Sequence, residues 1–227
     1  MTKTNVFIGV DIGQKVDNTA ICVAEELEGD RWEVHHLERM KLGTPYPKVA
    51  ARLAEVYHET VARVQAQQTK DDRAHGGFMR DAGMDPPPDI RARESVFVLI
   101  DSTGVGLPVC DFVRERAGIA EGHVTAVQFT AGEKLNVRLG QREGTVAKTY
   151  LVSRLAALMA GRRIKLPRTS EAKALADELE TFEITVSDAA TAQFGARQGT
   201  HDDLCMGLGL AVLIGGSRDE VRVERYA

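Results

Sequence analysis

Val6-Phe7-Ile8-Gly9-Val10-Asp11 decides the fold of this chain, because it is an unbroken apolar run that ends in a carboxylate. A short run without polar interruption is typical of a strand that is buried on both faces of a sheet. Val96-Phe97-Val98-Leu99-Ile100-Asp101 repeats the same pattern further along the chain. The sequence therefore predicts two buried strands, each with an aspartate at its carboxyl end.

A third acidic signature lies near the end of the sequence, where Asp202 and Asp203 open the apolar stretch 204–214. Carboxylates at two strand ends and one helix start can converge on one point, where they repel each other unless cations lie between them. Mg²⁺ suits such a cluster because it prefers hard oxygen ligands. Each aspartate also has a plainer interpretation: Asp11 and Asp101 as turn residues, and the 202–203 pair as acidic residues at a helix N-terminus.

The order of the other elements follows from the periodicity of the apolar residues. We predict strands at 5–11, 20–27, 32–40, 95–101, 123–129 and 181–187, with a hairpin turn at 28–31. We predict helices at 47–65, 106–117, 144–160, 170–180 and 202–215. Three strands of antiparallel type, a helix and then a strand–helix–strand unit give the order of a ribonuclease H-like α/β fold. Its mixed sheet should have five or more strands, flanked by helices.

Residues 66–94 interrupt this pattern. The stretch is first Gln-rich and charged, and then contains Gly76-Gly77 and the triplet Pro86-Pro87-Pro88. Such a composition favours a long, flexible or irregular excursion. Because a core strand follows directly, we predict a single domain over residues 1–227 and not two domains joined by a linker.

The charge is unevenly distributed. A formal net charge of −4 argues against a generally basic protein that coats nucleic acid. Residues 133–168 differ from this average, because they contain nine Lys and Arg against two Glu. This surplus is either a solvated surface or a stripe that faces phosphates beside the acidic residues.

The sequence also indicates a cellular compartment. Cys22, Cys110 and Cys205 lie in apolar segments without CxxC spacing, so they look like core residues of a protein in a reducing compartment. The N-terminal residues lack the pattern of a signal peptide. The longest candidate membrane segment, residues 204–216, is too short to span a bilayer. We predict a soluble, cytoplasmic protein.

Three segments resemble the nuclease domain of phage large terminase subunits. They are Val6-Phe7-Ile8-Gly9-Val10-Asp11-Ile12-Gly13, Ile100-Asp101-Ser102-Thr103-Gly104-Val105-Gly106 and Gly199-Thr200-His201-Asp202-Asp203-Leu204. Residues 147–167 are similar to the part of that family that precedes its last acidic motif. The resemblance covers nearly the whole chain except residues 66–94. The last motif is fairly specific, whereas the first two are shared across ribonuclease H-like proteins.

The resemblance implies a ribonuclease H-like endonuclease that cuts concatemeric viral DNA with the help of metal ions. On that basis Asp11, Asp101 and Asp203 match the family's catalytic carboxylates, with Asp202 as a close fourth. They would hold two Mg²⁺ or Mn²⁺ ions across the scissile phosphate. Asp11 is expected to bridge the two ions, with Asp101 on one of them and Asp203 on the other.

The same resemblance implies double-stranded DNA as the substrate, in the cytoplasm of a bacterial host. We predict that the basic stripe contacts the DNA backbone through Lys134, Arg138, Arg142, Lys148, Arg162 and Arg163. His201 is either a hydrogen-bonded loop residue or a contact to the scissile phosphate or its water. A packaging ATPase and a portal assembly are the other expected partners, and a membrane is not. Because the sequence contains no G-x-x-x-x-G-K-[ST] loop, it is not expected to drive packaging alone.

Two other functions fit parts of the pattern. Asp11-Ile12-Gly13 and residues 101–106 also resemble the phosphate motifs of actin- and sugar-kinase-like phosphotransferases, although those enzymes enclose ATP between two such domains. A relative that binds DNA without cutting it is the other alternative. ATP binding without cleavage would favour the first function, and salt-dependent DNA binding without cleavage would favour the second.

Overall fold

The structure of the chain is a computed structural model. It describes residues 5–13, 17–74, 88–104, 106–116, 118–132, 134–186, 192–196 and 202–215. Its strands are β1 (Val6–Asp11), β2 (Ala20–Leu27), β3 (Arg31–Arg39), β4 (Val96–Asp101), β5 (Val124–Thr130), β6 (Leu135–Asn136), β7 (Glu143–Ala147), β8 (Ile164–Lys165), β9 (Phe182–Val186) and β10 (Ala192–Ala196). Its helices are α1 (Tyr46–Ala74), α3 (Pro88–Arg93), α4 (Gly106–Arg116), the short 3₁₀ turn η1 (Glu121–His123), α5 (Lys148–Ala160), α6 (Ser170–Thr181) and α7 (Asp203–Ala211).

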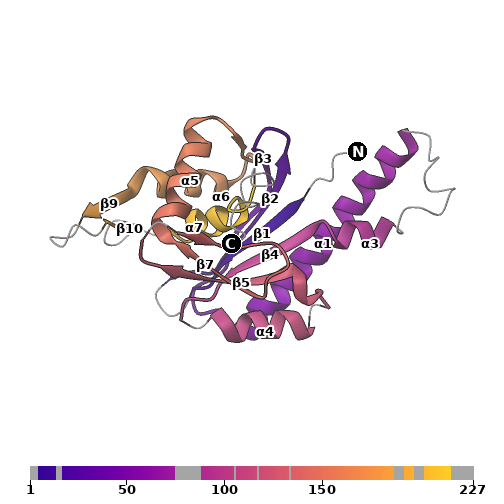
Figure 1. The fold of residues 1–227 in the computed structure, drawn as a ribbon, viewed down its shortest axis with the longest axis horizontal. Coiled ribbons are helices and arrows are strands. Elements are labelled where there is room, and N and C mark those ends of the chain that lie inside the picture. Colours follow the sequence, from indigo (N-terminus) through magenta and orange to yellow (C-terminus); the bar gives the residue numbers. More distant parts are fainter. Residues whose placement is uncertain are drawn as a thin grey trace, which may run out of the picture.

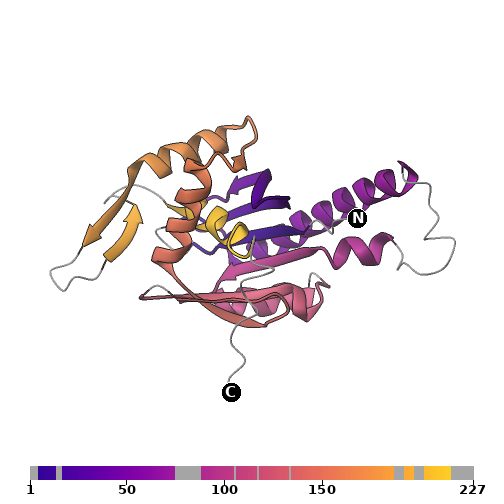
Figure 2. The ribbon, with the colours of Figure 1, turned by 45° about the horizontal axis from the view of Figure 1, so that its top comes forward.

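Eight of these strands form one mixed sheet in the order β6-β7-β5-β4-β1-β2-β3-β8. The first three strands along the chain pair antiparallel with one another, β1 with β2 and β2 with β3, as the predicted hairpin requires. Strand β4 runs parallel to β1, and β5 and β7 continue in the same direction. Strands β9 and β10 form a separate hairpin that projects away from the sheet (Figures 1 and 2).

The two faces of the sheet carry two separate apolar cores, because successive side chains of a strand point to opposite faces. From β1, Ile8 and Val10 enter the core beneath α1, α3 and α4. Phe7 enters the other core, beneath α5, α6 and α7. Figure 1 shows these two groups of helices on opposite sides of the sheet. Strand β1 is therefore buried on both faces, as its unbroken apolar sequence predicts.

Helix α7 lies directly on β1 because residue 9 has no side chain. A Cβ atom at Gly9 would lie 2.1 Å from the carbonyl oxygen of Gly207 and 2.4 Å from the amide nitrogen of Ala211, both on α7. These distances are shorter than any normal contact, so only glycine allows this approach. The close packing brings the beginning of α7 to the carboxyl end of β1.

Two parts of the sequence interpretation need correction. Helix α1 does not end near residue 65 but continues to Ala74, into the stretch 66–94 that we expected to be irregular, and the short helix α3, Pro88–Arg93, lies wholly within that stretch. Residues 75–87 lie outside the described part of the chain. The helix expected at 144–160 begins only at Lys148, because residues 143–147 pair with β5 as a parallel strand.

The cysteines occupy the positions expected of core residues. Cys22, Cys110 and Cys205 are buried and form no disulfide with one another. Burial raises the pKa of the Cys110 thiol to about 12. In the parts of the chain that the structure describes, no helix combines the length and the apolar character that crossing a membrane needs.

Candidate metal centre

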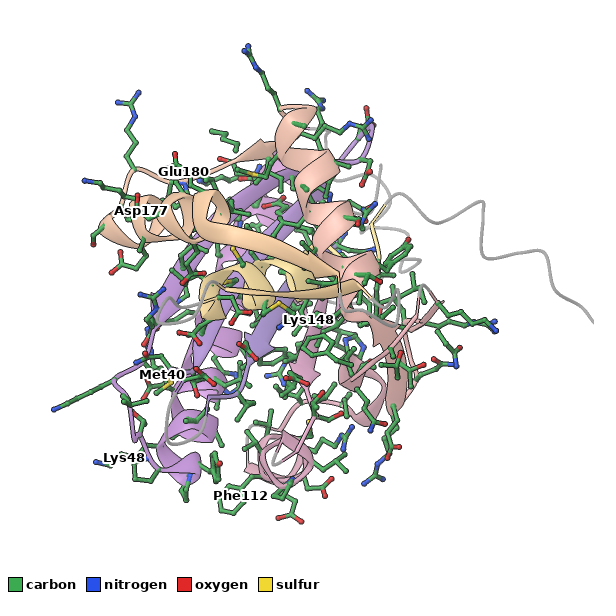
Figure 3. The ribbon with its side chains drawn as sticks, turned by 90° about the vertical axis from the view of Figure 1, so that its left-hand side faces the viewer. Met40, Lys48, Phe112, Lys148, Asp177 and Glu180 are labelled. Carbon is green, nitrogen blue, oxygen red and sulfur yellow. The ribbon has the colours of Figure 1, made fainter. Side chains whose placement is uncertain are left out.

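A cavity of about 350 Å³ lies at the carboxyl ends of β1 and β4. Its lining includes all four predicted carboxylates, Asp11, Asp101, Asp202 and Asp203, together with Lys148. They come from the end of β1, the end of β4, the start of α7 and the start of α5. In Figure 3 Lys148 lies near the middle of the view, below α6. The structure thus brings together acidic residues that are far apart in the sequence.

The topology explains why these residues meet. Strands β1 and β4 are parallel neighbours, with Val10 opposite Ile100, so the next residue of each strand lies at the same edge of the sheet. Helix α7 reaches that edge through its contact with Gly9. Strand β7 runs parallel to β5, and α5 follows it directly with Lys148 as its first residue. The carboxyl ends of β1 and β4 and the first residues of α5 and α7 therefore lie around one cavity.

Burial raises the pKa values of two aspartates in the cavity, and repulsion between carboxylates adds to this effect at Asp11. Burial, and then the negative charges of Asp101, Asp203 and Asp202, hold the pKa of Asp11 well above its usual range, whereas Lys148 lowers it. Burial also raises the pKa of Asp101, an effect that its hydrogen bonds with Thr103 and Asp11 and the charge of Lys148 partly offset. A cation placed among these oxygens would relieve this repulsion.

Lys148 already supplies one positive charge at the cavity wall. Its Nζ lies 3.1 Å from Oδ2 of Asp202. The Asp202 side chain therefore pairs with Lys148 and makes no hydrogen bond that caps α7, although Asp202 is the residue at the N-terminal end of this helix. Hard carboxylate oxygens around one cavity are the donor set that Mg²⁺ and Mn²⁺ prefer, so the residues present fit such an ion. Among the residues that the structure describes, no three carboxyl, imidazole or thiol groups are gathered tightly enough to hold a metal ion as they stand.

The raised pKa of Asp11 predicts how the stability of the metal-free protein depends on pH. A carboxyl whose pKa is higher in the folded state binds more protons there than in the unfolded chain. Asp11 therefore contributes to the stability of the folded state at low pH. This contribution is lost as the pH rises from about 4, the pKa of an aspartate in the unfolded chain, through the higher pKa of the folded state. We expect thermal unfolding in EDTA between pH 5 and pH 8 to show a steeper loss of stability for the wild type than for Asp11→Asn. Equal slopes would contradict this account of the cavity.

The loop after β4 is a tight turn that presents Asp101. The Asp101 Oδ1 accepts a hydrogen bond from the Thr103 amide at 2.8 Å, and the Thr103 hydroxyl accepts one from the Phe129 amide at 3.0 Å. A Cβ at Gly106 would lie 1.9 Å from the carbonyl oxygen of Asp101, so glycine is needed for α4 to begin this close to the strand. A glycine-rich loop can either approach a phosphate with its backbone or turn sharply into a helix, and the observed geometry is that of the sharp turn.

Both ends of α7 are held by side chains that the sequence interpretation did not single out. Near its start, the Cys205 amide donates a hydrogen bond to Oε2 of Glu178, on α6, at 2.9 Å. Past its end, the Arg154 guanidinium on α5 donates to the carbonyl oxygens of Val212 and Gly215, each at 2.7 Å. Asp203 is fixed on a helix that is anchored at both ends, which is what a precise ligand position requires.

Several residues at or near the cavity escaped the sequence interpretation. Asp17, Thr103 and Phe129 contribute to the lining. Arg39, the last residue of β3, forms an ion pair with Glu178 and lies 3.5 Å from Oδ2 of Asp203. The sequence did not indicate that Arg39 and Glu178 are neighbours. One lies at a strand end and the other within the predicted helix 170–180, and only the folded structure brings them together.

The predicted DNA-contacting residues do not form one continuous patch. Lys148 lies in the cavity, and Lys134 is close to it, since its carbonyl accepts a hydrogen bond from Ala147. Arg162 and Arg163 follow the opposite end of α5, about 20 Å away by the rise of a helix of that length. Arg138 and Arg142 are exposed and precede β7, whose other end is the one beside the cavity. His201 lies outside the described residues.

No family model and no curated protein sequence matches this chain. Solved structures of large terminase nucleases do match its fold. The nuclease of the thermophilic phage G20c with bound magnesium is 21% identical, with a TM-score of 0.57 over 94% of this chain and 82% of that one. The nuclease domain of Thermus phage P74-26 is 19% identical, with a TM-score of 0.52 over 93% of this chain and 80% of that one.

The human cytomegalovirus terminase nuclease domain, soaked with manganese, is 8% identical, with a TM-score of 0.51 over 97% of this chain and 87% of the other. At such identities the similarity establishes a shared fold. It confirms the predicted ribonuclease H-like architecture, a mixed sheet of more than five strands flanked by helices. The resemblance that the three sequence motifs indicated is thus confirmed for the fold.

Proposed function

We propose that this chain, which has the fold of large terminase nuclease domains, is a metal-dependent endonuclease that hydrolyses phosphodiester bonds of double-stranded DNA. The observation that carries the proposal is the cavity in which Asp11, Asp101, Asp202 and Asp203 meet. Residues 1–227 are taken as a single nuclease domain. Two matching nuclease structures contain bound magnesium or were soaked with manganese, which supports the choice of cation.

The carboxylates would hold the cations, with Asp11, Asp101 and Asp203 as the principal ligands and Asp202 beside them. When bound, a pair of divalent ions lowers the pKa of a water molecule and stabilises the negative charge that develops on the phosphate. The repulsion that raises the pKa of Asp11 would fall on metal binding, because the cations replace protons as the compensating charge. Binding and folding are therefore linked at this site.

Lys148 is placed to orient the DNA strand. It lines the same cavity as the carboxylates, and its side chain is about one third exposed, at 34%. A positive charge there can contact a phosphate oxygen next to the reacting bond. Lys134, Arg138, Arg142, Arg162 and Arg163 lie farther out and would add affinity for the backbone that does not depend on sequence. A packaging ATPase and a portal assembly are the partners that we propose for such a nuclease.

Incubating the purified protein with supercoiled plasmid tests this function. We expect nicked and then linear DNA with Mg²⁺ or Mn²⁺, and intact plasmid when EDTA is present. Binding to DNA should weaken steeply with rising salt, because each phosphate contact releases counterions. Salt-dependent binding with intact plasmid in both metals would overturn the nuclease proposal and favour a DNA-binding relative that does not cut. Tight ATP binding without DNA cleavage would favour a phosphotransferase.

A further inference from the structure

An ion-pair cluster of Arg39 and Glu178 contacts Asp203. Asp203 is the first residue of α7 and is only 1% exposed. The Nε of Arg39 lies 3.5 Å from its Oδ2. The same guanidinium donates through Nη2 to Oε1 of Glu178, whose side chain is 5% exposed. Arg39 is thus shared between two buried carboxylates.

Glu178 has a second function in this arrangement. Its Oε2 accepts the hydrogen bond of the Cys205 amide, in the first turn of α7. One carboxylate therefore contacts both the backbone of the helix that carries Asp203 and the arginine that faces Asp203. Burial raises the pKa of Glu178, while the Cys205 amide and Arg39 lower it, so its partners favour the charged form.

The position of Arg39 follows from the alternation of side chains along β3. Glu38 points to the face covered by α1, where it pairs with Arg52. The next residue, Arg39, points to the face covered by α6 and α7. The end of β3 therefore places a cation beside the start of α7.

One arginine between two buried carboxylates sets up a competition for charge. Removing the charge of Glu178 would leave Arg39 free to pair more closely with Asp203, which would then offer less negative charge to a metal ion. Removing Arg39 would have the opposite effect, because a divalent cation would become the main compensation for Asp203. The two changes are expected to act on metal binding with opposite signs.

We propose that Arg39 and Glu178 act as positioning residues that control how strongly Asp203 binds a divalent cation: Glu178 holds the arginine back from Asp203, and Arg39 neutralises Asp203 when no metal is bound. This inference rests on the proposed metal site and adds to it a control of affinity through residues that contact the ligand. Partners of metal-binding side chains commonly change metal affinity by a factor of about 10 to 100.

Titration of the metal-free protein with Mn²⁺ in a calorimeter tests the proposal without DNA. Glu178→Gln keeps one oxygen for the Cys205 amide but loses both the charge and the oxygen that accepts from Arg39, and we expect it to weaken Mn²⁺ binding by about tenfold. Arg39→Gln should strengthen Mn²⁺ binding by a similar factor. It should also lower the unfolding temperature in EDTA and show a larger rise with added Mn²⁺ than the wild type does.

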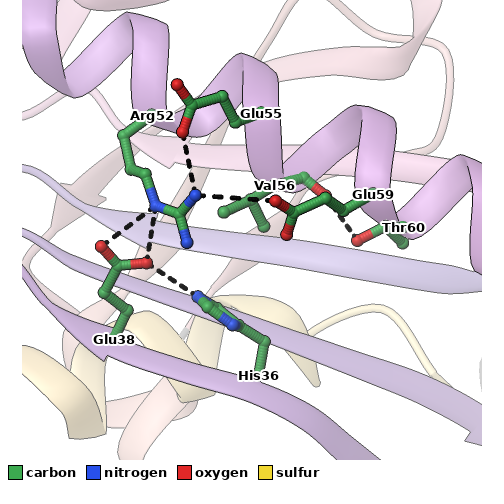
Figure 4. A network of polar contacts seen from close by, with 7 residues as sticks. All are labelled: His36, Glu38, Arg52, Glu55, Val56, Glu59 and Thr60. Carbon is green, nitrogen blue, oxygen red and sulfur yellow. Dashed lines mark hydrogen bonds and ion pairs between the residues drawn. The ribbon is translucent and has the colours of Figure 1, made fainter.

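Arg52→Gln is the matched control. Arg52 is 29% exposed and Arg39 26%, and Arg52 also pairs with several carboxylates (Figure 4). It lies on the opposite face of the sheet, so its loss should leave Mn²⁺ affinity unchanged. If Glu178→Gln is folded and binds Mn²⁺ as tightly as the wild type, the pair is merely structural and the inference is overturned. A wild type that takes up no Mn²⁺ would instead refute the proposed function, and this inference with it.

Discussion

Asp11→Asn is expected to reduce Mg²⁺-dependent nicking of plasmid DNA by roughly a thousandfold or more, since metal ions contribute several kcal/mol of transition-state stabilisation. Asp11 interacts electrostatically with the other three carboxylates, because the negative charge of each of them raises its pKa. Replacing it removes the oxygen charge that the two proposed metal positions share. Initial rates of conversion of supercoiled plasmid measure the effect.

The same variant should be folded, and in EDTA at pH 7 it should be more stable than the wild type. Asn keeps the shape of the side chain and removes one of the repelling charges, so the electrostatic repulsion in the metal-free cavity is smaller. Asp71→Asn, on α1 and outside the cavity, is the control that should cut DNA at the wild-type rate. Undiminished cleavage by folded Asp11→Asn would refute the site.

Gly9→Ala is expected to destabilise the protein by about 3 kcal/mol or more, because one methyl group would separate α7 from β1. The added Cβ would meet backbone atoms of Gly207 and Ala211 at 2.1 and 2.4 Å, and backbone cannot rotate away as a side chain can. The shift would also move Asp203 relative to Asp11, so cleavage should fall together with stability. Urea unfolding monitored by circular dichroism measures the loss.

Gly122→Ala provides the comparison for this experiment. A Cβ at Gly122 would have its nearest neighbour at 3.7 Å, which is an ordinary contact. Its stability should remain within about 1 kcal/mol of the wild type, since Gly→Ala changes at compatible sites have small effects. If Gly9→Ala were as stable as Gly122→Ala, the account of how α7 reaches the cavity would be wrong.

The sequence predicted those parts of the fold that depend on apolar pattern. Strands β1 and β4 are unbroken apolar runs, and the structure buries them at the centre of the sheet. The carboxylate after each run falls at the same edge because the two strands are parallel neighbours. The interpretation of Asp101 as a turn residue also agrees with the structure, in which Gly106 allows α4 to begin close to the strand.

Other features could not be read from pattern alone. Residues 66–74 have a charged, Gln-rich sequence without a clear apolar face, but these residues tolerate helix well, and α1 continues through them. Strand β7, Glu143–Ala147, is short and derives its stability from pairing with β5, a contact distant in sequence. The neighbourhood of Arg39, Glu178 and Asp203 depends on the order of strands and helices in space, which no local pattern encodes.

Anomalous diffraction from crystals soaked in MnCl₂ tests the central claim most directly, namely that Asp11, Asp101 and Asp203 jointly bind divalent cations. We expect manganese peaks inside the cavity at the carboxyl ends of β1 and β4, in contact with oxygens of these three aspartates. Crystals of Asp11→Asn should show weakened or missing peaks there. Wild-type crystals with no manganese in this cavity, or with manganese bound only elsewhere on the protein, would contradict the account.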